Sequence, residues 1–335
     1  MNIDINHPEI EKYAPIIIPT LNRYEHLKRC VESLSRCNLA DKTELIIGLD
    51  YPPSEKYVHG YKQICEYLPT ISGFGKVTII RRDRNYGVPG NASDLWETVL
   101  QRYDCYIFTE DDNEFAPNFL EYVNWGLREF KDDKTIFAIC GCKDIDTTDI
   151  NNNVYKLNTL FNAWGYGIWI DRYKHLKEVA NLDFMRGVIE NASMFDVFSK
   201  RVCSLASIAS QLAMKTVHGD FSVSLLPANS KWCIFPSVNK VRNWGWDGTG
   251  THGGSEESLQ KYSSLPMDSD NHFTPVIVED LYNPVVYQRF KEKYKKSLKS
   301  YFRAVVIFMS YKLTGYIPVS NKRSKWLKVK LQKVQ

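Results

Sequence analysis

The stretch Cys105-Tyr106-Ile107-Phe108-Thr109-Glu110-Asp111-Asp112 decides how this chain folds. Its first half is an apolar run that predicts a buried β-strand, and its second half places three carboxylates where that strand ends. Hard cations such as Mg²⁺ or Mn²⁺ take oxygen ligands and keep positions open for substrate phosphates. A strand that ends in a carboxylate cluster therefore suggests chemistry on phosphate esters. The alternative is an acidic turn that faces solvent.

The chain upstream of this stretch alternates apolar runs with helical patterns. Apolar runs at residues 14–19, 45–49 and 77–80 predict buried strands. Helical patterns follow them, at residues 25–35, 55–68, 91–103 and, after the acidic triplet, 117–130. Strands that alternate with helices of about ten to fifteen residues indicate βαβ units. We therefore expect an α/β fold with a Rossmann-like, mostly parallel sheet and flanking helices.

Polar residues stand at the carboxyl ends of three of these strands. Residues 20–23 follow the first strand, Asp50 follows the second, and the acidic triplet follows the fourth. In open parallel sheets, ligands bind outside the carboxyl ends of the strands. This convergence favours a binding site over an exposed acidic turn.

Three later segments have distinctive compositions. Residues 161–169 are rich in aromatic residues and glycine, and predict either a core strand with bulges or an aromatic platform for a sugar ring. Residues 243–254 contain five glycines and two tryptophans, which predicts a mobile loop or lid. Residues 256–275 are polar and predict a linker.

The composition is that of an ordinary globular protein, with 335 residues and 44% hydrophobic content. Its eight cysteines are scattered, which favours reduced core residues over a zinc site or a disulfide framework. The first thirteen residues carry charges and have no apolar region, so we expect no secretory signal.

Charge is distributed unevenly along the chain. Residues 291–335 hold 13 Lys and Arg and a single acidic residue, whereas residues 1–290 hold 30 basic and 38 acidic residues. The acidic body argues against nucleic-acid binding. Residues 286–335 predict basic amphipathic helices, with apolar runs far shorter than the ~20 residues that span a bilayer. We expect this tail to attach to an anionic membrane surface, or else to pack on the acidic body.

The acidic triplet is followed by Ala116-Pro117-Asn118-Phe119, and this combination resembles the GT-A glycosyltransferases. The motif is most similar to that of the inverting N-acetylglucosaminyltransferase I type and of bacterial family 2-like transferases. The resemblance runs from about residue 15 to residue 252. It implies a GT-A catalytic domain over residues 1–255, with a nucleotide-binding part at 14–130 and an acceptor part at 131–255. The linker, 256–275, and a basic helical tail, 276–335, would follow.

The resemblance also implies an activity. A sugar would pass from a UDP-sugar to a hydroxyl of a glycan or lipid-linked saccharide acceptor, with Mn²⁺ or Mg²⁺ as cofactor and with inversion at the anomeric carbon. Together with the basic tail, this predicts a bacterial enzyme on the cytoplasmic face of the cell membrane.

Individual roles carry over from the family motif. Asp112 would bind the metal, Glu110 and Asp111 would face the ribose and the sugar, and Arg23 would lie close to the nucleotide. Asp50 would accept a hydrogen bond from the uracil N3–H, a donor that cytosine lacks. The further candidates for the nucleotide and donor site are Pro19, Thr20, Arg84, Asn85, Gly87, Trp164, Gly165 and Tyr166.

Two downstream residues complete the implied site. Asp220, within His218-Gly219-Asp220-Phe221, stands where the family has its general base, although the tryptophans that flank that base in the family are absent. His252 stands at the end of the glycine-rich segment and would be either a metal ligand or a hydrogen-bonding residue of the lid.

Two other classes compete with the transferase. A noncatalytic protein that binds sugar nucleotides or glycans would keep the fold without a base. A sugar nucleotidyltransferase would need a glycine-rich loop for the triphosphate, and residues 19–23 offer none.

Overall fold

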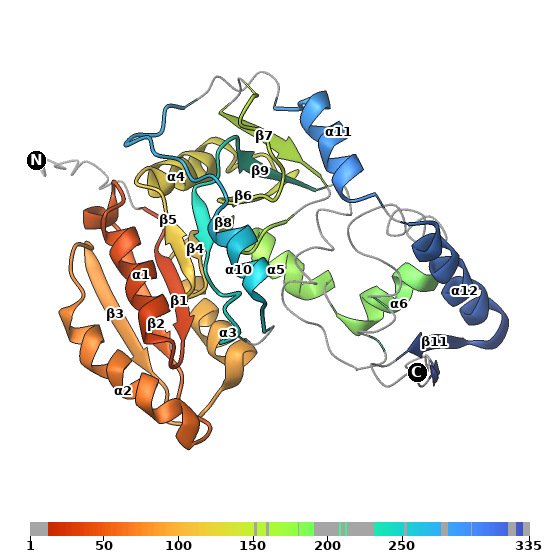
Figure 1. Cartoon of the computed structure of the whole chain (residues 1–335), viewed down its shortest axis with the longest axis horizontal. Helices are drawn as coiled ribbons and strands as arrows, with labels where there is room; N and C mark the ends of the chain where they lie inside the picture. Colours follow the sequence, from red (N-terminus) through yellow and green to blue (C-terminus); the bar gives the residue numbers. More distant parts are fainter. Residues whose placement is uncertain are drawn as a thin grey trace, which may run out of the picture.

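The structure is a computed structural model and describes residues 13–150, 153–158, 161–179, 181–190, 208, 212, 231–250, 253–275, 281–295, 297–320 and 326–330. The described residues form an eight-stranded sheet with the strand order β3-β2-β1-β4-β8-β6-β9-β7 (Figure 1). Its strands are β1 (Ile16–Thr20), β2 (Glu44–Leu49), β3 (Lys76–Arg81), β4 (Cys105–Phe108), β6 (Ile136–Cys140), β7 (Val154–Leu157), β8 (Tyr166–Trp169) and β9 (Trp232–Pro236).

The first half of the sheet is parallel and is built from βαβ units. Strands β3, β2, β1 and β4 run in the same direction. The helices α1 (Tyr24–Ser35), α2 (Val58–Tyr67) and α3 (Gly87–Leu100) lie between them in the sequence, with the short 3₁₀ turns at Ala40–Lys42, Glu55–Tyr57 and Leu68–Thr70. The expected α/β fold with a mostly parallel sheet is confirmed.

The first three residues of β1 are all isoleucine because both faces of the sheet are covered. Ile16 and Ile18 pack in the cluster that contains Leu27 of α1, while Ile17 packs in the opposite cluster with Leu95 of α3. All three isoleucines are fully buried. Burial of each such side chain contributes roughly 2 kcal/mol relative to exposure, so the strand is held rigidly in the sheet.

The second half of the sheet departs from the βαβ pattern. Strand β8 runs antiparallel between β4 and β6, β9 is parallel to β6, and β7 is antiparallel to β9. The described helices in this half are α4 (Phe119–Glu129), α5 (Ile170–Val179) and α6 (Leu182–Glu190). Helix α4 contributes Leu120 and Val123 to the cluster that contains α1.

A small ribbon beside the main sheet connects two distant parts of the chain. Strands β5 (Asn113–Phe115) and β10 (Val241–Asn243) pair antiparallel, so that Asn113 lies opposite Asn243. The segment after β10 is therefore brought to the end of β4.

The C-terminal segments differ from the expected linker and tail. Residues 256–263, placed in a linker by their polarity, form helix α10 (Glu256–Ser263), and the Ser255 hydroxyl caps its first turn by accepting from the Ser258 N–H at 3.1 Å. The basic tail consists of helices α11 (Pro284–Lys293) and α12 (Leu298–Thr314), followed by a hairpin of β11 (Tyr316–Ser320) and β12 (Trp326–Lys330). The hairpin was not expected. Among the described residues, no helix is long and apolar enough to cross a bilayer.

Candidate functional site

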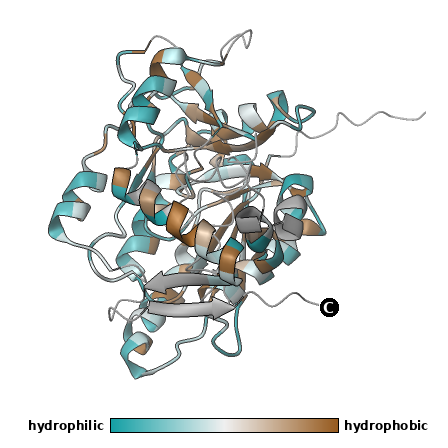
Figure 2. Cartoon of the chain, turned by 90° about the vertical axis from the view of Figure 1, so that its right-hand side faces the viewer, coloured by the Kyte–Doolittle hydropathy of each residue, from teal (hydrophilic) through white to brown (hydrophobic). Residues whose placement is uncertain are grey.

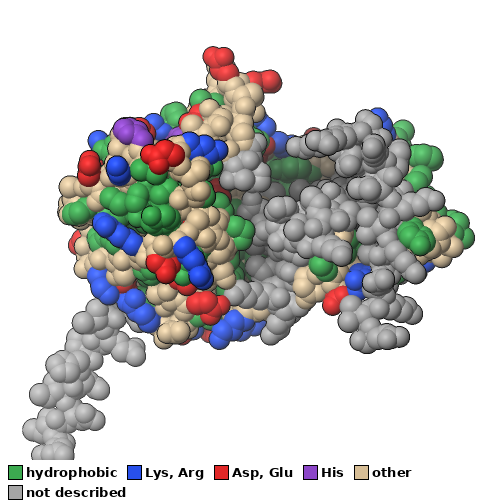
Figure 3. All heavy atoms as spheres, turned by 90° about the horizontal axis from the view of Figure 1, so that it is seen from below, with side chains coloured by type: hydrophobic (Ala, Val, Ile, Leu, Met, Phe, Trp, Pro, Cys, Tyr) green, Lys and Arg blue, Asp and Glu red, His purple; other side chains and the backbone are tan. Residues whose placement is uncertain are grey.

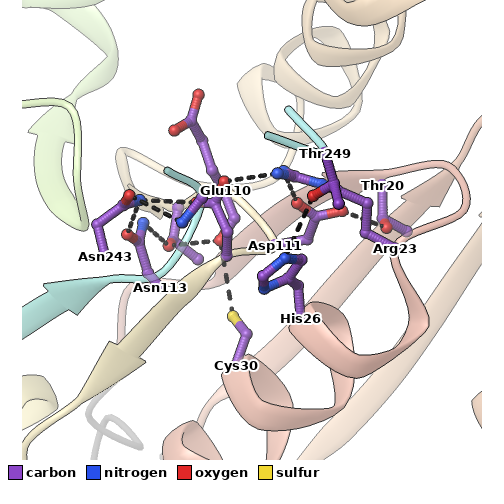
Figure 4. A network of polar contacts seen from close by, with 12 residues as sticks. Thr20, Arg23, His26, Cys30, Glu110, Asp111, Asn113, Asn243 and Thr249 are labelled. Atoms are coloured by element: carbon purple, nitrogen blue, oxygen red, sulfur yellow. Dashed lines mark hydrogen bonds and ion pairs between the residues drawn. The ribbon is translucent and has the colours of Figure 1, made fainter. Parts of the chain in front are cut away.

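Two buried carboxylates and one arginine meet at the carboxyl end of β4. Arg23, in the turn between β1 and α1, forms ion pairs with Asp111 and with Asp112, the latter at 2.9 Å between Nη1 and Oδ2. The Thr20 hydroxyl donates to Asp111 Oδ2 at 2.7 Å. The Asp111 and Asp112 side chains are 6% and 8% exposed, so this cluster lies beneath the surface. Figure 4 shows Thr20 and Arg23 converging on Asp111.

The electrostatics of this cluster follow from its burial. Burial raises the pKa of Asp111, and the neighbouring charge of Arg23 opposes that shift. Burial alone would lower the pKa of Arg23, but the charges of Asp111 and Asp112 raise it above its usual value. Two carboxylates therefore share a single guanidinium, and the ionised cluster keeps a net negative charge that favours a further cation.

The other face of Asp112 is organised by the segment that follows β10. The Asn243 amide donates to Asp112 Oδ1 at 2.8 Å and to Asn113 Oδ1 at 2.9 Å. The backbone N–H of Trp244 donates to the Asp112 backbone carbonyl at 2.8 Å. A Cβ atom at Gly245 would lie 2.0 Å from Asp112 Oδ2, so no larger residue fits at this position without displacement of the carboxylate.

The glycine-rich segment predicted as a lid lies over the acidic cluster in this structure, as far as residue 250. His26 of α1 contacts Asp247 at 2.9 Å between Nε2 and Oδ2. The Thr249 N–H and hydroxyl donate to the other oxygen of Asp247 at 3.0 and 2.7 Å. Figure 4 shows Thr249 beside His26, and Asn243 beside Asn113. The contact with His26 thus ties residues 244–250 to α1.

Asp50 lies at the end of β2 and holds the turn that follows β3. Its Oδ1 accepts from the N–H groups of Tyr51 and Tyr86 at 2.9 and 2.8 Å, and its Oδ2 accepts from the Asn85 amide at 3.2 Å. Asp50 is buried. Each carboxylate oxygen has two lone pairs, so Oδ2 keeps capacity for another donor.

The other nucleotide candidates lie along the same edge. Pro19 is in β1, Arg84 is exposed with its guanidinium 5.6 Å from the Tyr86 ring centre, and Gly87 begins α3 with a φ of +68°. The structure thus places Thr20, Arg23, Asp111 and Asp112 in one cluster and Asp50 and Asn85 in a second one.

The aromatic candidates separate into two groups. Tyr166 is buried in the core between Phe108 and Phe161, and Gly165 is buried beside it, so core packing accounts for both residues. Trp164 instead meets Tyr262 of α10 edge-on at 5.1 Å, and Tyr262 stacks on Trp246 at 4.9 Å. This aromatic cluster lies next to the glycine-rich segment.

Several residues of the site have no sequence motif that identifies them. Asn243 and Gly245 belong to a segment identified by its glycine content. His26 lies in an ordinary helical pattern, and Tyr262 lies in the segment expected to be a linker. Their contacts with the acidic cluster and the lid join residues far apart in the chain. Asp220 and His252 lie outside the described residues.

A family model connects this geometry to known proteins. Residues 16–189 match the model described as Glycosyl transferase family 2. The chain belongs to glycosyl transferase family 2. The match begins at β1 and ends in α6, so it contains the acidic cluster and Asp50 but not the segment after β10.

Solved structures resemble this family 2 chain only distantly. The crystal structure of S. aureus TarS, residues 1–349, is 12% identical with a TM-score of 0.34, and the match covers 50% of this chain and 49% of that chain. A mannosyltransferase from Pyrobaculum calidifontis, in complex with GDP-Man and Mn²⁺, is 13% identical with a TM-score of 0.34, covering 68% and 58%. The chain thus spans about half of the length of the TarS fragment. A comparison with curated proteins finds no match.

The cluster of this family 2 chain has the donor chemistry that a divalent cation requires. Asp112 offers carboxylate oxygens, which Mg²⁺ and Mn²⁺ prefer, and the cluster is net negative. Within the described ranges, no three His, Cys, Asp or Glu side chains are placed to hold a metal together. A cation at Asp112 would compete with Arg23 for this carboxylate.

Proposed function

We propose that this chain is a metal-dependent, inverting glycosyltransferase that transfers a sugar from a UDP-sugar to a hydroxyl of a glycan or a lipid-linked saccharide. The observation that carries the proposal is the buried pair Asp111–Asp112 at the end of β4, which shares Arg23 and lies under residues 243–250. The chain's membership of glycosyl transferase family 2 also supports a glycosyltransferase activity.

Donor binding would use both clusters at the sheet edge. Asp50 Oδ2 can accept from the uracil N3–H, while Asn85 keeps that carboxylate in place. Asp111, held by Thr20, would face the ribose, and Glu110 would face the sugar. Asp112 would ligate Mn²⁺ or Mg²⁺ at the diphosphate. Its hydrogen bond with Asn243 already orients the carboxylate for this role.

Catalysis requires charge neutralisation on the leaving diphosphate and removal of a proton from the acceptor hydroxyl. A divalent cation, when bound, supplies the first of these as a Lewis acid. Arg23 adds a second positive charge at the same edge. Asp220 would accept the acceptor proton, with attack from the face opposite UDP, so that a single displacement inverts the anomeric carbon. Residues 243–250 would exclude water, which limits hydrolysis of the donor.

Two features support the proposed saccharide acceptor: the aromatic cluster and the basic charge of the tail. Trp246 lies in the lid, and Trp164 is linked to it through Tyr262; both tryptophans would stack on an acceptor sugar. The lysines and arginines within residues 286–335 favour attachment to an anionic membrane. This would bring the enzyme to a lipid-linked acceptor on the cytoplasmic face.

The direct test is UDP release from a panel of UDP-sugars with Mn²⁺. We expect release with one donor. NMR of the product should show that the anomeric configuration is inverted. Asp112→Asn should lower the rate by about a hundredfold or more, because a cation at the leaving group contributes several kcal/mol. Asp132→Asn, the same change at an exposed carboxylate, should have no effect. Wild-type rates in Asp112→Asn would exclude the proposed role.

A second variant separates transfer from binding. Asp220→Asn should keep the affinity for the UDP-sugar and lose transfer, because only the acceptor proton is affected. Binding of a UDP-sugar by the wild-type protein without release of UDP from any donor would instead support a noncatalytic binding protein.

A further inference from the structure

Helix α12 presents an unusual apolar surface to solvent. Six of its residues have exposed fractions between 40% and 88%: Leu298, Phe302, Val305, Val306, Met309 and Leu313. We call these six side chains the α12 stripe. Figure 2 looks onto the end of the molecule that carries α12 and shows hydrophobic residues, in brown, along the helix. Exposed apolar patches of this kind mark interaction sites in soluble proteins.

The geometry of the helix explains how the stripe arises. At 3.6 residues per turn, the six positions fall within an arc of about 100° on the helix surface. Ile307 points the opposite way and is 1% exposed, so the buried face of α12 is the one that carries Ile307. The helix has 17 residues, which makes the stripe about 25 Å long. Figure 3, seen from below, shows hydrophobic side chains in green at the right-hand end.

Basic residues border the α12 stripe on both sides. In angular position around the helix, Lys299 falls at one border of the stripe, about 20° beyond Val306, and Lys312 falls at the other border, about 20° beyond Val305. Arg303 lies beyond Lys299. The sequence from residue 293 to residue 335 contains no acidic residue. An apolar strip between cationic borders is the pattern of a helix that lies in the plane of an anionic membrane.

The neighbouring helix α11 behaves differently. Val286 and Phe290 are buried in the core cluster on the α3 side of the sheet. Arg289 forms ion pairs with Asp149 at 2.6 Å, and Lys293 reaches Asp144 at 2.7 Å. The tail therefore divides: α11 packs on the body, which was the alternative left open by the sequence, and α12 turns its apolar face outward.

We propose that the α12 stripe is a membrane-binding surface, inserted in the plane of an anionic lipid leaflet with Lys299 and Lys312 at the level of the headgroups. A second copy of the chain fits less well, because two stripes in contact would bring the lysine borders of both copies together. This inference narrows the membrane attachment proposed for residues 286–335 to α12. The stripe lies outside the acidic cluster, so the inference does not rest on the proposed transferase activity.

The test is cosedimentation of the full chain with vesicles of phosphatidylglycerol and phosphatidylcholine in equal parts, compared with vesicles of phosphatidylcholine alone. We expect binding to the mixed vesicles that weakens as salt is added. The double variant Phe302→Asp/Met309→Asp should bind at least ~10-fold more weakly, because charges enter the apolar interface. Lys299→Gln/Lys312→Gln should lose the preference for the anionic vesicles.

Matched measurements keep the result specific. Val285→Asp changes an exposed apolar residue of α11 outside the stripe and should bind vesicles like the wild type. UDP release in solution should be the same in all variants, which separates this test from that of the transferase. Wild-type vesicle binding by Phe302→Asp/Met309→Asp would overturn the proposal. So would a wild-type dimer in sedimentation velocity that this variant dissociates, without any vesicle binding.

Discussion

At the scale of single residues, the site depends on contacts that span most of the chain. Asn243 and Asp112 are separated by 131 positions, and His26 and Asp247 by 221. The motif after β4 was sufficient to select Asp112 as a candidate, because a carboxylate cluster after an apolar run is a local pattern. Arg23 was selected from its place after the first strand and from the family resemblance. Asn243 and His26 could not be selected in this way, since their partners are fixed only when the strands pair.

Gly245 gives a sharp test at this scale. In Gly245→Ala the new methyl group would meet Asp112 Oδ2, so the carboxylate or the lid must shift. We expect a loss of about 1–3 kcal/mol in the free energy of unfolding, from overpacking, and a fall of at least ~10-fold in UDP release.

Gly187→Ala in α6 is the matched control, because a Cβ there meets nothing within 4 Å. It should leave UDP release unchanged. Equal release rates in Gly245→Ala and the wild type would show that residue 245 does not lie against Asp112 in the working enzyme.

At the scale of elements, local periodicity predicted the parallel half of the sheet but not the pairing of the rest. The apolar runs near residues 16–18, 45–49 and 105–108 became β1, β2 and β4, because both of their faces are buried. The antiparallel insertion of β8 between β4 and β6 and the ribbon of β5 with β10 are pairings of distant segments, which the period of a single segment cannot indicate.

Glu44 shows how neighbouring elements are fastened. This residue of β2 accepts from Thr78 of β3 at 2.7 Å and from Arg102, just after α3, at 2.7 Å. Burial raises its pKa, but hydrogen bonds from Tyr103, Thr78 and Lys76 outweigh that effect and lower the pKa to about 2. The ionised form is therefore preferred in the folded state.

This shift predicts a pH dependence of stability. The folded pKa lies below the ordinary value of 4.5, so the stabilisation by Glu44 is complete above about pH 4.5 and is lost as the pH falls toward 2. Glu44→Gln should lower the free energy of unfolding at pH 7 by about 2 kcal/mol, and its difference from the wild type should vanish at low pH. Urea unfolding at a series of pH values measures this. The exposed Glu66→Gln should show no such convergence, and a constant difference for Glu44→Gln would contradict the assignment.

At the scale of the whole molecule, the parts of the chain divide the proposed work. The parallel half carries Asp50 and the acidic cluster, as is usual at the carboxyl ends of parallel strands. The later segments supply the lid and the aromatic cluster, and α12 offers a surface to lipid. The sequence predicted the α/β architecture and the basic character of the tail. It did not separate α11 from α12, because both show apolar residues at helical spacing and only the packed structure distinguishes a buried face from an exposed one.

The central claim is that Asp112 holds a divalent cation together with the donor diphosphate. Titration of Mn²⁺ followed by electron paramagnetic resonance, with saturating UDP, tests it without dependence on turnover. We predict that the wild type and Asp132→Asn bind one Mn²⁺ per chain and that Asp112→Asn loses this binding while keeping its fold by circular dichroism. An unchanged Mn²⁺ affinity in Asp112→Asn would contradict the account.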